Sequence, residues 1–436
     1  MTVEWATEKL SDLCEQIADC PHSTPLWTDS GAIVLRNQNI RYGRLDLSSP
    51  SYTDETHFEQ RSRRARLRAG DLVITREAPM GEVCMVPKGL RCCLGQRMVM
   101  LRPDPKKCDS RFLLYSIQSD VVRHEILVNE GTGSTVSNLR IPLLEALPIP
   151  HPPLAEQKAI AAVLGALDDK IELNRQMNAT LEAMARALFQ SWFVNFDPVR
   201  AKLDGRKPIG LDAVTAALFP ATFQDSPLGS IPQGWEVCSL ANKIDLLSGG
   251  TPKTSESDYW DGDIPWYSVR DAPSETDVWV IHTEKQVTKL GIANSAAQIL
   301  PEGTTIISAR GTVGKLALVG IPMAMNQSCY GVRGTKDGSN FFTYYALRAA
   351  TAELQQRTHG TVFDTITRQT FETLDCIFPS TNLTTAFDST VSPLLVQIQA
   401  NVRQSRTLAT LRDTLLPKLL SGEISVNARH IATAHA

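Results

Sequence analysis

The sequence lacks the short motifs by which most enzymes are recognised. It contains no Walker A sequence and no DEAD-type pair, and Gly131-Thr132-Gly133 lacks the third glycine and the preceding strand of a dinucleotide- or S-adenosylmethionine-binding loop. The histidines show no HxxxH spacing and no mixed Cys/His spacing, so no metal site is indicated. These absences favour a protein that binds and positions other molecules over one that catalyses.

Long apolar runs, strong net charge and CxxC pairs are also missing. The longest apolar stretch, residues 159–167, is far shorter than the roughly 20 residues that span a bilayer, and the N-terminus does not have the pattern of a signal peptide. The nine cysteines, an odd number with no CxxC pair, indicate reduced thiols in a cytoplasmic protein. The formal net charge is −3, so nucleic-acid binding would require a local basic patch.

The 436-residue chain repeats itself, and a long helical pattern closes each copy. Gly70 and Gly303 begin similar strand patterns 233 positions apart. Residues 171–193 align without a gap with residues 398–420, which lie 227 positions later. Two related units with similar cores and different surfaces indicate two versions of one task.

Each copy combines strand and helix patterns, as in an α+β unit. In the first copy, residues 32–35, 72–75 and 98–101 are apolar or β-branched runs bounded by turn residues. Residues 112–128 have helical spacing. A proline-rich stretch at residues 147–153 closes the copy, because a helix cannot persist there.

Two long helices are predicted to follow the two copies. Residues 154–193 contain no proline, and the second pattern covers about residues 383–416, where Pro417 interrupts it. Each apolar stripe is too wide for an exposed helix, so we expect an antiparallel helix pair with the globular units related by a pseudo-twofold axis. The seam positions are Ile171, Leu181 and Leu188 in the first helix and Ile398, Leu408 and Leu415 in the second. Leu411 also belongs to the second stripe, and Met177 and Met184 broaden the first.

A basic segment precedes the strand at residues 72–75. It contains five arginines within eight residues: Arg61, Arg63, Arg64, Arg66 and Arg68. One interpretation is a solvated charged face. The other is a strip that contacts DNA phosphates through Arg63, Arg64 and Arg66.

Polar side chains recur at matched turns in both copies, directly after strands. Each alone is more often a turn-capping or surface residue. Their recurrence favours DNA contact, because loops on a scaffold carry function and Arg, Asn and Gln bond base edges in the major groove. The candidates are Arg36, Asn37, Gln38, Asn39, Arg76, Gln96, Arg97, Ser134, Thr135 and Asn138 in the first copy, and Ser268, Arg270, Arg310, Gln327, Thr361 and Thr365 in the second.

Several longer motifs resemble those of type I restriction-modification specificity (S) subunits. They include Pro153-Leu154-Ala155-Glu156-Gln157 and Leu228-Gly229-Ser230-Ile231-Pro232-Gln233-Gly234-Trp235, together with residues 167–171, 188–198 and 415–424. The likeness covers nearly the whole chain. One departure is the start of the second helix at residues 383–387, which lacks the Glu-Gln pair that follows Pro153.

The resemblance implies an α+β fold in which a long antiparallel two-helix coiled coil separates two α/β globular target recognition domains. The implied segments are target recognition domain 1 (1–153), a central helix (154–197), a linker (198–234), target recognition domain 2 (235–380), a C-terminal helix (381–424) and a tail (425–436). The helices would act as a spacer and as the docking surface for modification (M) subunits.

The resemblance also implies the function. Each domain would read one half of a bipartite, asymmetric double-stranded DNA target. The chain itself would be non-catalytic and would bind no cofactor or metal. Two M subunits would carry S-adenosylmethionine and methylate adenine, and restriction (R) subunits would use ATP and Mg²⁺.

Two other functions compete with this interpretation. An autonomous DNA methyltransferase is one, but Asn195-Phe196-Asp197-Pro198 resembles the amino-methyltransferase motif only superficially, with misplaced prolines. A non-DNA coiled-coil scaffold with tandem binding heads is the other. Binding of S-adenosylmethionine by the chain alone would support the first, and salt-dependent binding to duplex DNA would argue against the second.

Overall fold

The computed structural model describes four stretches of the chain: residues 5–128, 138–334, 339–357 and 365–426. The chain divides into two units, with unit 1 formed by residues 1–170 and 407–436 and unit 2 by residues 171–406.

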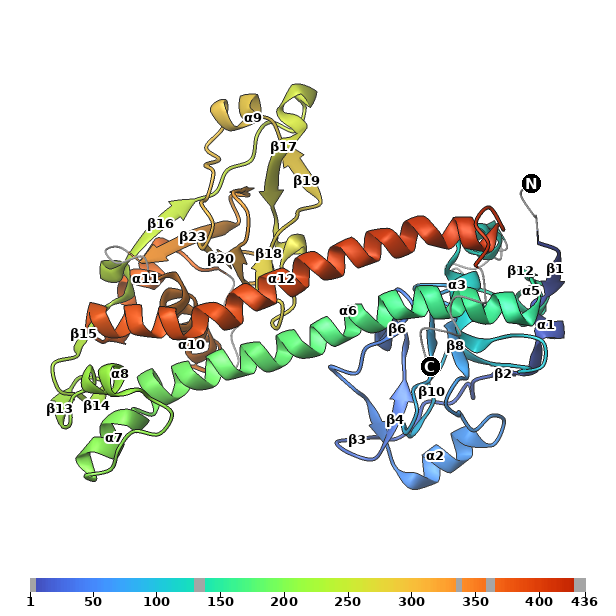
Figure 1. The fold of residues 1–436 in the computed structure, drawn as a ribbon, viewed down its shortest axis with the longest axis horizontal. Coiled ribbons are helices and arrows are strands. Elements are labelled where there is room, and N and C mark those ends of the chain that lie inside the picture. The colour runs from blue at the N-terminus through green and yellow to red at the C-terminus, as the bar shows by residue number, and fades with distance from the viewer. Residues whose placement is uncertain (1–4, 129–137, 335–338, 358–364, 427–436) are drawn as a thin grey trace. The chain divides into compact units, whose positions relative to one another are not determined.

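Each unit combines a sheet-rich domain with one segment of each of two long helices. These are α6 (Leu154–Phe189) and α12 (Thr381–Leu420), drawn in green and red in Figure 1. The repeated α+β architecture predicted from the sequence is confirmed.

Unit 1 is built on two four-stranded sheets. One is antiparallel with strand order β2-β11-β8-β9, and the other has the order β10-β4-β7-β3 with β10 parallel to β4. The strands are β1 (Thr7–Lys9), β2 (Cys14–Asp19), β3 (Trp27–Thr28), β4 (Ala32–Leu35), β5 (Ile40–Arg41), β6 (Arg44–Leu45), β7 (Tyr52–Thr53), β8 (Leu72–Thr75), β9 (Val83–Met85), β10 (Cys92–Leu94), β11 (Met98–Pro103) and β12 (Pro148–Pro150). The helices of its domain are α1 (Leu10–Leu13), α2 (Glu55–Ser62), α3 (Ser110–Gln118), α4 (Asp120–Val128) and α5 (Ile141–Glu145).

The central strand β8 is apolar on both faces because both faces are covered. Leu72 and Ile74 belong to one core cluster of unit 1, and Val73 belongs to another. Helix α3 begins where the Asp109 carboxylate accepts hydrogen bonds from the first backbone N–H groups of the helix. The single helical run predicted over residues 112–128 is two helices, because the chain leaves helical geometry at Ser119.

Unit 2 repeats this plan. The strand order β16-β23-β20-β21 corresponds to β2-β11-β8-β9, and the parallel pair β17–β22 corresponds to β4–β10. Its strands are β13 (Phe223–Ser226), β14 (Gly229–Pro232), β15 (Glu236–Ser239), β16 (Ile244–Ser248), β17 (Trp260–Tyr267), β18 (Trp279–Val280), β19 (Lys285–Val287), β20 (Thr305–Ser308), β21 (Leu316–Val319), β22 (Ala324–Met325), β23 (Cys329–Gly334) and β24 (Asp375–Phe378). Its shorter helices are α7 (Asp197–Leu203), α8 (Ala213–Ala217), α9 (Lys289–Ala293), α10 (Asn340–Arg357) and α11 (Arg368–Thr373).

The segments of α6 and α12 within unit 2 run antiparallel and share a buried polar seam. The Asn174 side-chain amide donates to Gln404 Oε1 at 2.9 Å and to Ser405 Oγ at 3.1 Å. One turn farther along α6, Asn178 Oδ1 accepts from the Asn401 amide at 2.9 Å. Because a buried polar side chain needs its partner, these bonds fix the register of the pair.

The predicted seam positions differ in their burial. Ile171 and Ile398 are buried, whereas Leu181 and Leu188 are partly buried against the core of unit 2. Leu415 packs against the core of unit 1. Leu408 is partly buried and belongs to no core cluster among the described residues.

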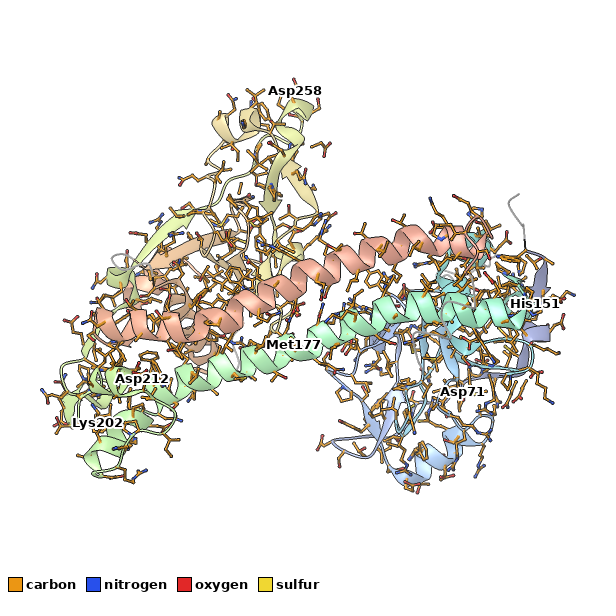
Figure 2. The ribbon with its side chains drawn as sticks, viewed as in Figure 1. Asp71, His151, Met177, Lys202, Asp212 and Asp258 are labelled. Carbon is orange, nitrogen blue, oxygen red and sulfur yellow. The ribbon has the colours of Figure 1, made fainter. Side chains whose placement is uncertain are left out.

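Three residues assigned to the helix stripes are instead exposed. Met177, labelled on α6 in Figure 2, is 36% exposed, Met184 is 50% exposed and Leu411 is 45% exposed. At 3.6 residues per turn, these positions fall outside the face that carries the buried seam. The predicted stripes were therefore too wide.

The end of the second long helix also differs from the prediction. Helix α12 continues through Pro417, because Leu419 and Leu420 at its end are buried in the core of unit 1. The linker at residues 198–234 is folded. It contains α7, α8 and the hairpin β13–β14, and it buries Phe219 and Ile231.

An aromatic cluster surrounds the end of α6 in unit 2. Phe387 of α12 lies edge-on to Phe189, Trp192 and Phe193, with ring centroids 5.8, 5.7 and 5.2 Å away. A π-helical turn (Gln190–Val194) follows α6, and the chain then turns at Phe196, which adopts a left-handed backbone conformation with φ 57° and is buried. The segment that resembles a methyltransferase motif is thus a helix end packed into a core.

All nine cysteines are free thiols. Burial raises the pKa of Cys92 to about 12, so this thiol stays protonated and unreactive near neutral pH. Within the described ranges there is no group of side chains suited to a metal ion, and none of the helices there is long and apolar enough to cross a membrane.

Candidate nucleic-acid interface

Three backbone hydrogen bonds hold the matched turns of unit 1 together. Gly95 N–H donates to Leu35 O at 2.8 Å, which ties the end of β10 to the end of β4. Arg76 N–H donates to Arg97 O at 2.8 Å, and Arg76 O accepts from Leu139 N–H at 3.0 Å. Turns that are distant in the sequence therefore form one frame.

Unit 2 has the same frame at the corresponding positions. Asn326 N–H donates to Tyr267 O at 2.9 Å, Ala309 N–H donates to Ser328 O at 2.8 Å, and Ile366 N–H donates to Ala309 O at 2.9 Å. We call these two sets of bonds the turn frames. Each turn frame joins turns of its own unit, and these are the turns that the sequence repeat matches between the two units.

In unit 1 the turn frame borders a hollow of about 750 Å³. Five predicted DNA-contacting residues line it: Arg36, Asn37, Gln38, Gln96 and Arg97. The hollow combines guanidinium groups and amides on one surface, which are the groups that bond base edges.

Sequence reasoning missed the other residues that line the hollow, among them Trp27, Arg41 and Tyr42. The Arg36 guanidinium lies 5.2 Å from the centroid of the Trp27 ring. Tyr42 is 77% exposed at the tip of the β5–β6 hairpin, where it and Gly43 have positive φ. A two-residue turn ending in glycine between short strands is a hairpin signal that could have indicated this tip.

Internal hydrogen bonds orient two amides of the hollow. The Asn37 side-chain N–H₂ donates to Glu77 O and to Ala78 O. The Gln96 side-chain N–H₂ donates to His22 O at 2.9 Å and to Thr24 Oγ1 at 3.2 Å.

Arg97 and Gln38, which also line the hollow, differ in their freedom. Arg97 is held by the Glu77 carboxylate, 2.9 Å from its Nε. Gln38 is exposed and has no side-chain partner within the described part of the chain. The hollow therefore contains both fixed and adaptable groups.

Two predicted contacts serve the fold instead, which corrects the prediction. Asn39 is 2% exposed, accepts from Arg36 N–H at 2.9 Å and donates to Asp46 O at 3.0 Å. Its amide caps the turn after β4 and is not available to DNA.

Arg76 is the second predicted DNA contact that instead serves the fold. Its guanidinium is 3.0 Å from the Asp19 carboxylate and donates to Leu139 O at 2.9 Å. A third bond, of 3.3 Å, engages Asn138 Oδ1. Arg76 thus braces the turn frame and also occupies the Asn138 side chain.

The predicted residues of unit 2 lie around its own turn frame. Ser268 donates to the Asp271 carboxylate at 2.9 Å, whereas Arg270 and Arg310 are exposed. Gln327 is exposed, and its Oε1 accepts from the Thr251 hydroxyl. Thr365 pairs with Arg310 through a backbone bridge. Ser134, Thr135 and Thr361 lie outside the described residues.

The arginines of this segment in unit 1 differ in their surroundings. Arg63 and Arg64 are exposed and have no side-chain partner among the described residues. Arg66 is exposed but pairs with Glu59. Arg61 is buried and donates to Leu94 O at 2.8 Å, so it belongs to the core.

The sequence matches the family described as "Type I restriction modification DNA specificity domain" over residues 2–183 and 232–383, one region for each repeat. The matched regions make up more than half of the chain, so the chain belongs to this family. Its function is accordingly DNA specificity in a type I restriction-modification system.

Individual relatives agree with this assignment. The chain is 26% identical over 370 residues to the type I restriction enzyme HindI specificity subunit of Haemophilus influenzae, covering 75% of this chain and 80% of that protein. It is 27% identical over 361 residues to the MjaIX specificity subunit of Methanocaldococcus jannaschii, covering 82% and 78%. The S subunit of a type I restriction-modification system from M. genitalium has the same fold, with a TM-score of 0.55, 18% identity and 96% coverage of both chains.

Proposed function

We propose that each unit of this specificity subunit reads one half of a bipartite, asymmetric DNA target. The observation that supports this is the pair of turn frames, which have the same backbone bonds and different side chains. Arg36 of unit 1 corresponds to Ser268 of unit 2, and Gln38 corresponds to Arg270. Different side chains on one scaffold select different bases.

The modified DNA of a cell that expresses the complete system tests this proposal. Sequencing with detection of methylated adenine is expected to give a split motif whose two halves differ. Replacing unit 2 by a second copy of unit 1 is expected to convert that motif into a palindrome. A palindromic motif for the natural chain would contradict the proposal.

The subunit acts with partners that hold the chemistry. Two M subunits carry S-adenosylmethionine and methylate adenine, and R subunits use ATP and Mg²⁺ for restriction. Helices α6 and α12 are the docking surface for the M subunits and the spacer that sets the gap between half-sites. The specificity subunit itself supplies no catalytic residue and binds no cofactor.

The competing functions make opposite predictions. An autonomous methyltransferase would bind S-adenosylmethionine without M subunits, which equilibrium dialysis of the purified chain measures. A scaffold unrelated to DNA would show no salt-dependent affinity for duplex DNA in the presence of M subunits. The segment around Phe196, which superficially resembles an amino-methyltransferase motif, packs into the core of unit 2. It therefore supports neither of the two competing functions.

The arginine strip is expected to contribute affinity rather than specificity. Changing Arg63 and Arg64 to alanine removes two exposed charges, so the slope of log affinity against log salt should flatten by about two units. Binding should weaken alike for cognate and random duplexes. Fluorescence anisotropy over a salt series measures both effects.

Arg91→Ala is the matched control. Arg91 is exposed in the same unit, but it pairs with Glu55 and its guanidinium lies over the Phe58 ring. Because its charge is already balanced, we expect little change in the salt slope. A changed target sequence with an unchanged slope in the Arg63/Arg64 variant would indicate base contacts instead of phosphate contacts.

A further inference from the structure

Gln96 and Gln327 occupy corresponding positions in the two turn frames. Gln96 follows Gly95, whose N–H is bonded to the end of β4, and Gln327 follows Asn326, whose N–H is bonded to the end of β17. Both side chains are exposed. The sequence alone would assign them the same role.

Internal hydrogen bonds orient the two side-chain amides in opposite directions. The carbonyl of His22 can only accept, so the N–H₂ group of Gln96 must face it and Oε1 faces away. In unit 2 the Thr251 hydroxyl donates to Oε1 of Gln327, so the N–H₂ group faces away. The free end of the side chain is an acceptor in unit 1 and a donor in unit 2.

A second side-chain amide in the hollow of unit 1 is oriented like that of Gln96, with its oxygen free. The Asn37 N–H₂ group is bonded to two carbonyl oxygens, Glu77 O and Ala78 O. Both of its hydrogens are therefore in use, and Oδ1 is the atom left for a ligand. Two acceptors from different turns thus line one hollow.

We propose that Gln96 determines specificity by accepting a hydrogen bond from an exocyclic amino group, whereas Gln327 donates to a base acceptor. In the major groove, the amino groups are adenine N6 and cytosine N4, and the acceptors are N7 and O6 of guanine, O4 of thymine and N7 of adenine. The inference rests on the proposed function and adds the chemical class that each unit selects at this position.

The test compares the same substitution at both positions, in the complete complex with M subunits. Glutamate has acceptors only, so Gln96→Glu keeps an acceptor at the free end of the side chain but loses the bond to the His22 carbonyl. Gln327→Glu keeps the acceptor that the Thr251 hydroxyl bonds and replaces the free donor by an acceptor. Gln96→Glu is expected to retain its amino-bearing base. Gln327→Glu is expected to lose about tenfold in affinity for its cognate half-site and to shift preference toward an amino-bearing base.

Base analogues identify the partner atom. For the half-site of unit 1, purine in place of adenine or 2-pyrimidinone in place of cytosine removes the amino group from one base at a time. One such change should cost the wild-type complex about tenfold, and it should cost the Gln96→Leu complex nothing further, because the bond is already absent. Thr251→Val serves as the matched variant in unit 2, since it frees the Gln327 amide to rotate and should relax selection there.

The outcomes separate this inference from the function on which it rests. A wild-type complex with no sequence preference would contradict the proposed function itself. A sequence-specific complex in which Gln96→Glu and Gln327→Glu change selection in the same way would leave the function standing and overturn the opposed roles. The opposed roles would also be overturned if the base analogues showed that Gln96 bonds a base acceptor rather than an amino group.

Discussion

Replacing Asp71 by alanine is expected to destabilise unit 1 by about 3–5 kcal/mol, because it leaves a mostly buried arginine without its counter-charge. The side chain of Asp71, labelled in Figure 2, is 4% exposed, and that of Arg102 is 14% exposed. Two hydrogen bonds join them, Nε to Oδ1 at 2.8 Å and a terminal nitrogen to Oδ2 at 2.7 Å. Oδ2 also accepts from Arg68 N–H, so the substitution removes a turn bond too.

Denaturant titration followed by circular dichroism measures the loss, and amide hydrogen exchange shows whether it is confined to unit 1. Glu59→Ala is the control, since Glu59 and Arg66 form an exposed pair in the same unit. Exposed pairs contribute at most about 1 kcal/mol. Equal stability of the two variants would show that the Asp71–Arg102 pair contributes no more than a surface contact.

Much of the fold follows from periodicity in the sequence. The strand at residues 72–75 is a continuous apolar run because it is covered on both faces, and the structure places β8 there. Two helices were recognised because buried positions such as Ile171 and Ile398 recur at helical spacing. Periodicity could not show that α12 passes Pro417, since that depends on burial of Leu420 in unit 1.

The candidate site was predictable as a set of turns and not as a set of side chains. The repeat located the turns that carry Gln38 and Gln96, because corresponding loops follow corresponding strands. It could not separate them from Asn39 or Arg76, whose partners Asp46 and Asp19 are brought near only by the fold. The opposite senses of Gln96 and Gln327 depend on His22 and Thr251, which no local pattern links to them.

The second large effect is expected in the aromatic cluster of unit 2. Phe387 is fully buried, and its ring lies against Phe189, Trp192 and Phe193. Phe387→Ala removes these contacts and leaves a cavity, which typically costs about 3–5 kcal/mol. The loss should appear as an earlier transition in thermal or denaturant unfolding, with faster amide exchange in the second half of α6 and the first half of α12.

Val396→Ala on the same helix provides the comparison, because Val396 is 52% exposed and its truncation opens no cavity. Substitution at such surface positions is usually within about 0.5 kcal/mol of neutral. Among the described residues, Phe387 belongs to a core cluster of unit 2 that is separate from the cores of unit 1. The exchange rates of β8 and β11 in unit 1 should therefore stay unchanged. If Phe387→Ala instead accelerates exchange in both units equally, the two units unfold together. Separate core clusters would then not give the two units separate stabilities.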